Sequence, residues 1–105
     1  MDSWATVSQL VEHYDERVPA EISPDLARQL RIDKITEEVG EVAEACQGIH
    51  GTNPRKGRSH TVEHLQKELA DVILTSMVAL RTMTPEAKKY FETYLAEKAE
   101  EVLTG

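Results

Sequence analysis

The sequence is poor in cysteine, glycine and proline, and each shortage excludes a class of protein. Cys46 is the only cysteine, which excludes an intrachain disulfide framework and any cysteine-rich zinc site. Five glycines and four prolines are too few for the many tight turns of a β sandwich or barrel. The remaining composition, with 40% hydrophobic and 30% charged residues, is typical of a globular chain.

Basic charge and long apolar segments are also scarce. Twelve basic residues against nineteen acidic ones give a net charge of −7, which argues against partners such as a nucleic acid polymer or an anionic membrane. The longest apolar-rich run, residues 69–80, is interrupted by Asp71 and is too short to span a membrane. The first residues lack the features of a signal peptide, so we expect a cytoplasmic protein whose residues 1–105 form one domain.

Hydrophobic spacing and helix-start signals predict four helices and no strand. Ser3 is the expected cap of a first helix over 4–16, and Ser23-Pro24 starts a second helix that ends near Gln47 before Gly48. Residues 48–60 lack periodicity and form a loop. A third helix begins after Ser59 or Thr61 and reaches about Arg81, and a fourth follows Thr84-Pro85-Glu86. The expected fold is all-α, an antiparallel four-helix bundle.

The second helix carries a predicted core stripe with acidic residues beside it. The stripe consists of four residues at helical spacing: Ile35, Val39, Val42 and Cys46. Glu38 and Glu41 lie on its flank, one turn apart, whereas Glu37 and Glu44 point further toward solvent. On composition alone, these glutamates fit an ordinary solvated helix face.

The third helix changes this interpretation because it is apolar almost all the way round. Such a helix is buried or covered by a partner subunit, so we expect a homodimer or homotetramer assembled through helix faces. Glu68 and Asp71 lie on one side of this helix, one turn apart. Two adjacent buried carboxylates repel each other and require a compensating positive charge, either a metal ion or a basic side chain.

Two acid pairs on neighbouring antiparallel helices, Glu38 with Glu41 and Glu68 with Asp71, are able to converge on one point. Four carboxylates without histidine or cysteine favour Mg²⁺, or Mn²⁺, over zinc. The sequence contains no Glu-x-x-His motif, so a di-iron carboxylate bundle is excluded. Since magnesium sites of this kind leave positions open for substrate phosphates, the pattern predicts phosphate chemistry.

Two acidic motifs carry a family resemblance: Glu-Glu-x-x-Glu within residues 34–45, and Glu68-Leu69-Ala70-Asp71. Together they resemble the MazG-like proteins of the all-α nucleoside triphosphate pyrophosphohydrolase superfamily. The resemblance implies Mg²⁺-dependent hydrolysis of a nucleoside triphosphate to the monophosphate and pyrophosphate, in a dimer or tetramer. It implies that four acids hold the metal: Glu38, Glu41, Glu68 and Asp71. It also implies that Glu37 orients or deprotonates the attacking water. The last helix departs from the pattern, because Lys98 is followed four residues later by Val102 where relatives often carry asparagine.

Several basic residues are candidates for binding the substrate's phosphates. Arg55, Lys56 and Arg58 form the densest basic patch, and they either close over a triphosphate as a lid or belong to a solvated loop. Lys34 lies one turn before Glu38 and either reaches a phosphate or pairs with that glutamate. Lys67 and Lys98 are further candidates.

Three functional interpretations remain open at this point. The first is a MazG-like enzyme that removes non-canonical or surplus (deoxy)nucleotides. The second is a phosphoribosyl-ATP pyrophosphohydrolase of histidine biosynthesis, which shares the same acid pattern. The third is a non-enzymatic helical interaction module in which the acids only form a solvated face.

Overall fold

Four α-helices make up the fold of the residues that the structure describes, as the hydrophobic spacing predicted. The computed structural model describes residues 1–52, 55 and 57–105, and this part of the chain contains no strand. The helices are α1 (Ser3–Asp15), α2 (Pro24–His50), α3 (Val62–Met83) and α4 (Ala87–Thr104). The all-α class is therefore confirmed. In the described residues, no helix is both long enough and apolar enough to cross a membrane.

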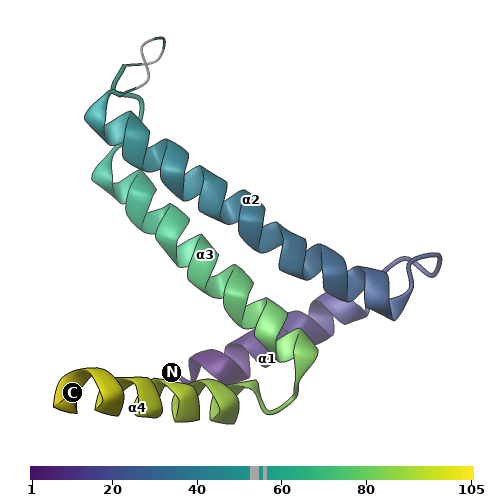
Figure 1. The fold of residues 1–105 in the computed structure, drawn as a ribbon. Helices are drawn as coiled ribbons and strands as arrows, with labels where there is room; N and C mark the ends of the chain where they lie inside the picture. The colour runs from purple at the N-terminus through teal and green to yellow at the C-terminus, as the bar shows by residue number, and fades with distance from the viewer. Residues whose placement is uncertain (53–54, 56) are drawn as a thin grey trace.

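The central unit of the bundle is the antiparallel pair α2 and α3, which lie side by side over most of their length (Figure 1). Helix α1 crosses the lower half of this pair and packs on α3, and α4 turns back below α3 and diverges from it toward the C-terminus. The radius of gyration is 17.0 Å. A compact domain of this length has a radius of about 13 Å, so the bundle is open rather than closed around one core.

Two helix ends differ from the expectation, and side-chain geometry gives the reasons. Asp2, not Ser3, caps α1, because its carboxylate accepts hydrogen bonds from the backbone N–H groups of Trp4 and Ala5. Helix α2 continues through Gly48 to His50, and the loop therefore starts at Gly51, whose φ of 66° ends the helix in the left-handed conformation. Gly48 is instead a close contact point, because a side chain there would collide with His60.

The predicted core stripe of α2 was wrong in two of its members. Val39 is 50% exposed and Cys46 is also exposed, whereas Glu38, Ala45 and Gly48 are buried. The more buried face of α2 therefore combines two members of the predicted stripe, Ile35 and Val42, which are half-buried, with buried Glu38, Ala45 and Gly48. The main hydrophobic cluster lies elsewhere, between α1 and α3. It consists of Val7, Val11 and Val78, with Trp4 and Met77 packed against them.

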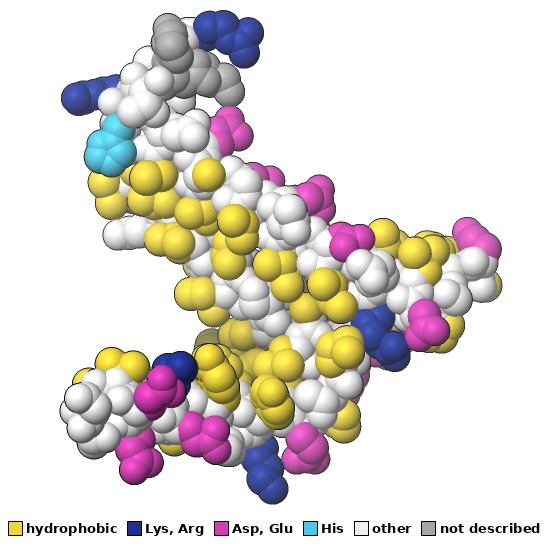
Figure 2. Space-filling view, viewed as in Figure 1, with side chains coloured by type: hydrophobic (Ala, Val, Ile, Leu, Met, Phe, Trp, Pro, Cys, Tyr) yellow, Lys and Arg dark blue, Asp and Glu magenta, His cyan; other side chains and the backbone are white. Residues whose placement is uncertain are grey.

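Much apolar surface stays exposed on this single chain. Figure 2 shows hydrophobic side chains along α2 and α3 and inside the angle between α3 and α4. Ile73 on α3 is 62% exposed, and on α4 only Ala87 is buried. The aromatic residues of α4, Tyr90, Phe91 and Tyr94, are all exposed in the single chain. An 18-residue helix with so little buried surface is marginal in water without further packing.

Candidate metal centre

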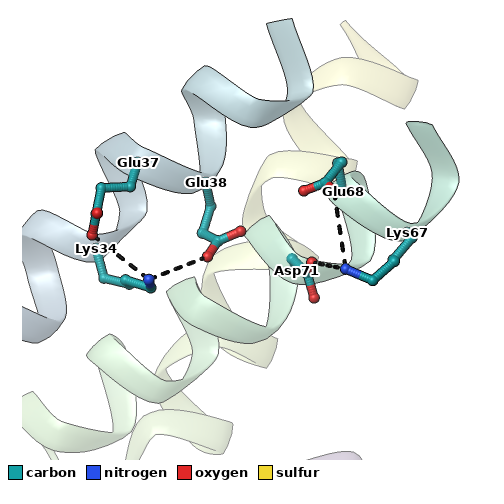
Figure 3. Close-up of polar contacts among 6 residues, drawn as sticks. All are labelled: Lys34, Glu37, Glu38, Lys67, Glu68 and Asp71. Atoms are coloured by element: carbon teal, nitrogen blue, oxygen red, sulfur yellow. Dashed lines mark hydrogen bonds and ion pairs between the residues drawn. The ribbon is translucent and has the colours of Figure 1, made fainter. Parts of the chain in front are cut away.

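Acidic side chains from α2 and α3 meet where the two helices lie against each other. Glu38 and Glu41 are one turn apart on α2, and Glu68 and Asp71 are one turn apart on α3, so each helix offers two carboxylates on one side. Figure 3 shows Glu38 pointing across the helix contact toward the α3 acids. The rigid helix pair, not a loop, therefore positions the acidic groups.

Three of the four acids predicted as metal ligands form a tight cluster. One carboxylate oxygen from each of Glu38, Glu41 and Glu68 lies within 4.8 Å of the other two. In the part of the chain that the structure describes, this is the group of metal-ligating side chains that is close enough to surround one ion. The three residues differ in burial, since Glu38 is buried, Glu68 is half-buried and Glu41 is exposed. One side of the cluster is thus enclosed by protein and the other is open.

The buried oxygens of the cluster fit the ligand set of a divalent cation. Oε2 of Glu38 and Oε2 of Glu68 are both buried, and neither accepts a hydrogen bond. A carboxylate oxygen withdrawn from water without a partner is unfavourable, and a divalent cation with oxygen ligands removes that cost. The residues present therefore match what Mg²⁺ or Mn²⁺ requires from a protein.

The same crowding raises the pKa of two of these carboxyl groups. The pKa of Glu38 lies above its ordinary value, mainly because burial disfavours the charged form and also because the Glu41 and Asp71 charges are near. The pKa of Glu68 is raised by a hydrogen bond shared with Glu41, by burial and by the neighbouring acids. The cluster thus holds more negative charge than its surroundings neutralise.

Asp71, the fourth predicted ligand, is engaged by a lysine. Lys67 Nζ lies 3.0 Å from Asp71 Oδ2 and 4.0 Å from Glu68 Oε1 (Figure 3). These contacts raise the pKa of Lys67, with the Asp71 hydrogen bond as the largest cause. Lys67 therefore supplies part of the positive charge that the adjacent acids require. The sequence offered a signal for this role, because Lys67 and Asp71 have the i, i+4 spacing of a helix ion pair.

Lys34 and Glu37 border the cluster on α2. Lys34 Nζ lies 3.7 Å from Glu37 Oε2 and 3.8 Å from Glu38 Oε1, between the two carboxylates (Figure 3). The Glu37 side chain is 66% exposed and points toward solvent beside the acids. Lys34 thus makes the helix pair that its spacing indicated, and a role in phosphate binding stays a prediction, as does the catalytic role of Glu37.

The basic loop lies at the far end of the helix pair (Figure 1). The end of α2 at His50 lies nine positions beyond Glu41, which is about 14 Å along the helix axis. Arg55 and Arg58 belong to this loop, beyond the end of α2, and are exposed, so the structure does not bring them beside the acids. Lys56 lies outside the described residues.

Lys98 is also remote from the acids within one chain. It lies in the C-terminal half of α4, which diverges from α2 (Figure 1), and its ammonium pairs with Glu101 at 3.3 Å. Contact with phosphates at the acidic cluster would therefore need a second chain or a movement of α4.

Comparison with known proteins gives one match. Residues 5–98 match the family described as phosphoribosyl-ATP pyrophosphohydrolase. No curated protein and no solved structure matches the chain. The resemblance to MazG-like proteins is confirmed only at the level of the superfamily to which both families belong.

Proposed function

Because the chain belongs to the phosphoribosyl-ATP pyrophosphohydrolase family, we propose that it hydrolyses phosphoribosyl-ATP and releases pyrophosphate. Family membership supports a hydrolase that cleaves a phosphoric anhydride. The observation that carries the proposal is the cluster of Glu38, Glu41 and Glu68, with two buried carboxylate oxygens that lack partners. Removal of surplus or non-canonical (deoxy)nucleotides is the second candidate function, because the same acids suit any nucleoside triphosphate.

Glu38, Glu41 and Glu68 are the residues that would hold Mg²⁺, or Mn²⁺ in its place. Asp71 is close enough to influence the charge of Glu38, and it would complete the ligand set once its carboxylate is released by Lys67. Bound Mg²⁺ would neutralise the charge that develops on the departing pyrophosphate. The open side of the cluster, at Glu41, gives the triphosphate access.

The chain's own side chains would orient the nucleophile. Glu37 is the proposed base, because its exposed carboxylate lies one residue from the buried ligand Glu38 and is held near it by Lys34. A water molecule that donates a hydrogen bond to Glu37 attacks the α-phosphorus, and its proton passes to that carboxylate. The bond between the α-phosphorus and the bridging oxygen breaks, and the electron pair leaves with pyrophosphate.

The basic residues that the sequence singled out would bind the substrate's phosphates in this proposal. Lys34 is the best placed, because its ammonium already lies at the acidic cluster. Arg55, Lys56 and Arg58 would act only if the loop folds back along the helix pair, and Lys98 only from a second chain. The exposed apolar faces of α2, α3 and α4 support a homodimer or homotetramer, in which a second chain would cover them.

The test measures pyrophosphate release from phosphoribosyl-ATP and from a panel of ribo- and deoxynucleoside triphosphates, with Mg²⁺ or Mn²⁺. Glu38→Gln removes a buried ligand, and Glu63→Gln is its matched control, an exposed glutamate on α3. We expect turnover of phosphoribosyl-ATP that is lost in Glu38→Gln and kept in Glu63→Gln. Turnover confined to the nucleoside triphosphates would favour the second candidate. No turnover, together with no rise in melting temperature on adding metal, would leave only an interaction module.

A further inference from the structure

A second polar site lies at the other end of α2 from the basic loop. A cavity of about 320 Å³ opens where α1, the start of α2 and the end of α3 meet. Three arginines from two helices line it: Arg28 and Arg31 from α2, and Arg81 from α3. Val11, Val18 and other apolar side chains form the remaining wall. None of the roles assigned above uses these arginines.

The guanidinium groups are fixed in place and still have free donors. Arg31 Nη1 lies 2.8 Å from Asp15 Oδ1 and donates to Thr82 Oγ1 at 3.1 Å, and its side chain is only 15% exposed. Arg81 Nε donates to Ser8 Oγ at 3.0 Å. Arg28 Nη1 donates to Asp25 Oδ1 at 3.0 Å, while its buried Nε has no hydrogen-bond partner. Since each guanidinium carries five N–H donors, these contacts hold the three groups without exhausting them.

The cavity is positively charged in an otherwise acidic chain. Its lining holds three arginines against one carboxylate, Asp15, while the whole chain has a net charge of −7. Asp25, which pairs with Arg28, points into solvent with a side chain that is 91% exposed. The N-terminal end of α2, at Pro24, also borders the cavity and adds the positive end of its helix dipole. An excess of guanidinium charge in a partly apolar cavity favours an anion, and the planar guanidinium fork matches phosphate oxygens.

We infer that this cavity binds a phosphate monoester carried on a small organic group. The arginines and Thr82 recognise the phosphate, and the apolar wall of α1 and the α1–α2 connection receives the carbon skeleton. Two sources of this chemistry exist. One is the phosphate of the phosphoribosyl group, at the opposite end of the proposed substrate from its triphosphate. The other is a separate phosphorylated metabolite.

The position of the cavity favours the first source, a point that rests on the proposed function. Arg31 and Glu38 are seven residues apart, so they lie on the same side of α2 and about 10 Å apart along its axis. A substrate that carries phosphates at both ends would place the triphosphate at the acids and its remaining phosphate among the arginines. The arginine cavity would then separate phosphoribosyl-ATP from ordinary nucleoside triphosphates.

Binding is tested first, without metal and without turnover. Ribose 5-phosphate and ribose are titrated into the full chain and followed by calorimetry and by NMR shifts. We expect ribose 5-phosphate to bind and ribose not to bind. Arg81→Gln should weaken binding at least tenfold, and Arg28→Gln, at the rim of the cavity, provides a second variant if Arg81→Gln does not fold. Arg17→Gln, an exposed arginine outside the cavity, is the control and should bind as the parent does. Absence of binding, or equal binding in all variants, would overturn the inference.

Kinetics then separate the two sources. If the substrate's own phosphate occupies the cavity, Arg81→Gln lowers kcat/KM for phosphoribosyl-ATP relative to kcat/KM for ATP at least tenfold, and Arg17→Gln leaves the ratio unchanged. If ribose 5-phosphate binds without competing with phosphoribosyl-ATP, the occupant is a separate metabolite. A chain that turns over no nucleotide but binds ribose 5-phosphate through Arg81 would refute the proposed function and leave the phosphate site standing.

Discussion

Two glycines of α2 test how closely residues 59–60 pack against this helix. Gly40 and Gly48 lie in the same helix, and each is changed to alanine by adding one methyl group. Around Gly40, nothing lies within 4 Å of the position that this methyl would take. Glycine is less favourable than alanine inside a helix by about 1 kcal/mol. Gly40→Ala should therefore stabilise the fold by about that amount and raise Tm by roughly 4–8 °C.

The same change at Gly48 should have the opposite sign. The new methyl would collide with His60 Nδ1 and would lie 2.7 Å from Ser59 Oγ. It would also strain the connection at the end of the loop, where the Ser59 N–H donates to the Gly48 carbonyl at 3.0 Å. Overpacking of this kind costs roughly 1–3 kcal/mol, which meets or exceeds the gain of about 1 kcal/mol in helix propensity. Gly48→Ala should be no more stable than the parent, and as much as about 2 kcal/mol less stable.

The assay is thermal and urea unfolding followed by circular dichroism, with both variants measured beside the parent. The informative quantity is the difference in the free energy of unfolding between the two variants, because the helix-propensity contribution is common to both. A difference of roughly 1–3 kcal/mol is expected. Equal stabilisation by both changes would refute the close packing of residues 59–60 on α2, and with it the assignment of Gly48 as a close contact point.

Three further predictions concern the acidic cluster and assembly. The raised pKa of Glu38 means that its deprotonation opposes folding, so Glu38→Gln without metal should have a higher Tm than the parent at neutral pH. This difference in Tm should disappear as the pH falls below 4.5, the ordinary pKa of a glutamate. A difference in Tm that stays constant across the pH range would contradict the prediction. Lys67→Met removes a cation that competes for Asp71 and Glu68, so melting curves should show a larger stabilisation by MgCl₂ than in the parent at matched ionic strength, and an unchanged metal shift would exclude the competition. If a second chain covers α4, light scattering should give a dimer or tetramer mass that Phe91→Glu lowers, whereas a monomeric parent would refute the assembly.

The sequence predicted the number and type of the helices because their signals are local. Ser23-Pro24 supplies the cap and first residue of α2, and Thr61 caps α3 with its side chain on the His64 N–H. The Asp2 cap was missed because two adjacent residues, Asp2 and Ser3, are both good caps. Local rules do not decide between them.

The candidate site was predictable only in part, because burial depends on how helices rotate against each other. Counting turns placed Glu38 beside the α2 stripe, but it could not show that Glu38 would be buried while Cys46 stayed exposed. The sequence contained even less indication of the arginine cavity. Arg28 and Arg31 are one turn apart on α2, but Arg81 joins them only through the fold.

The acid-bearing helices α2 and α3 follow each other directly along the chain, joined by a single connection. Every carboxylate of the candidate metal centre therefore comes from one continuous hairpin, residues 38–71, and none comes from α1 or α4. The wall that α1 contributes to the arginine cavity, with Val11 and Asp15, is consequently on a different element from the acids. Substitutions in α1 are able to reshape one wall of the arginine cavity, and substitutions in α4 its exposed apolar face, while the spacing of the acids is preserved, so one acidic hairpin is compatible with different substrate preferences.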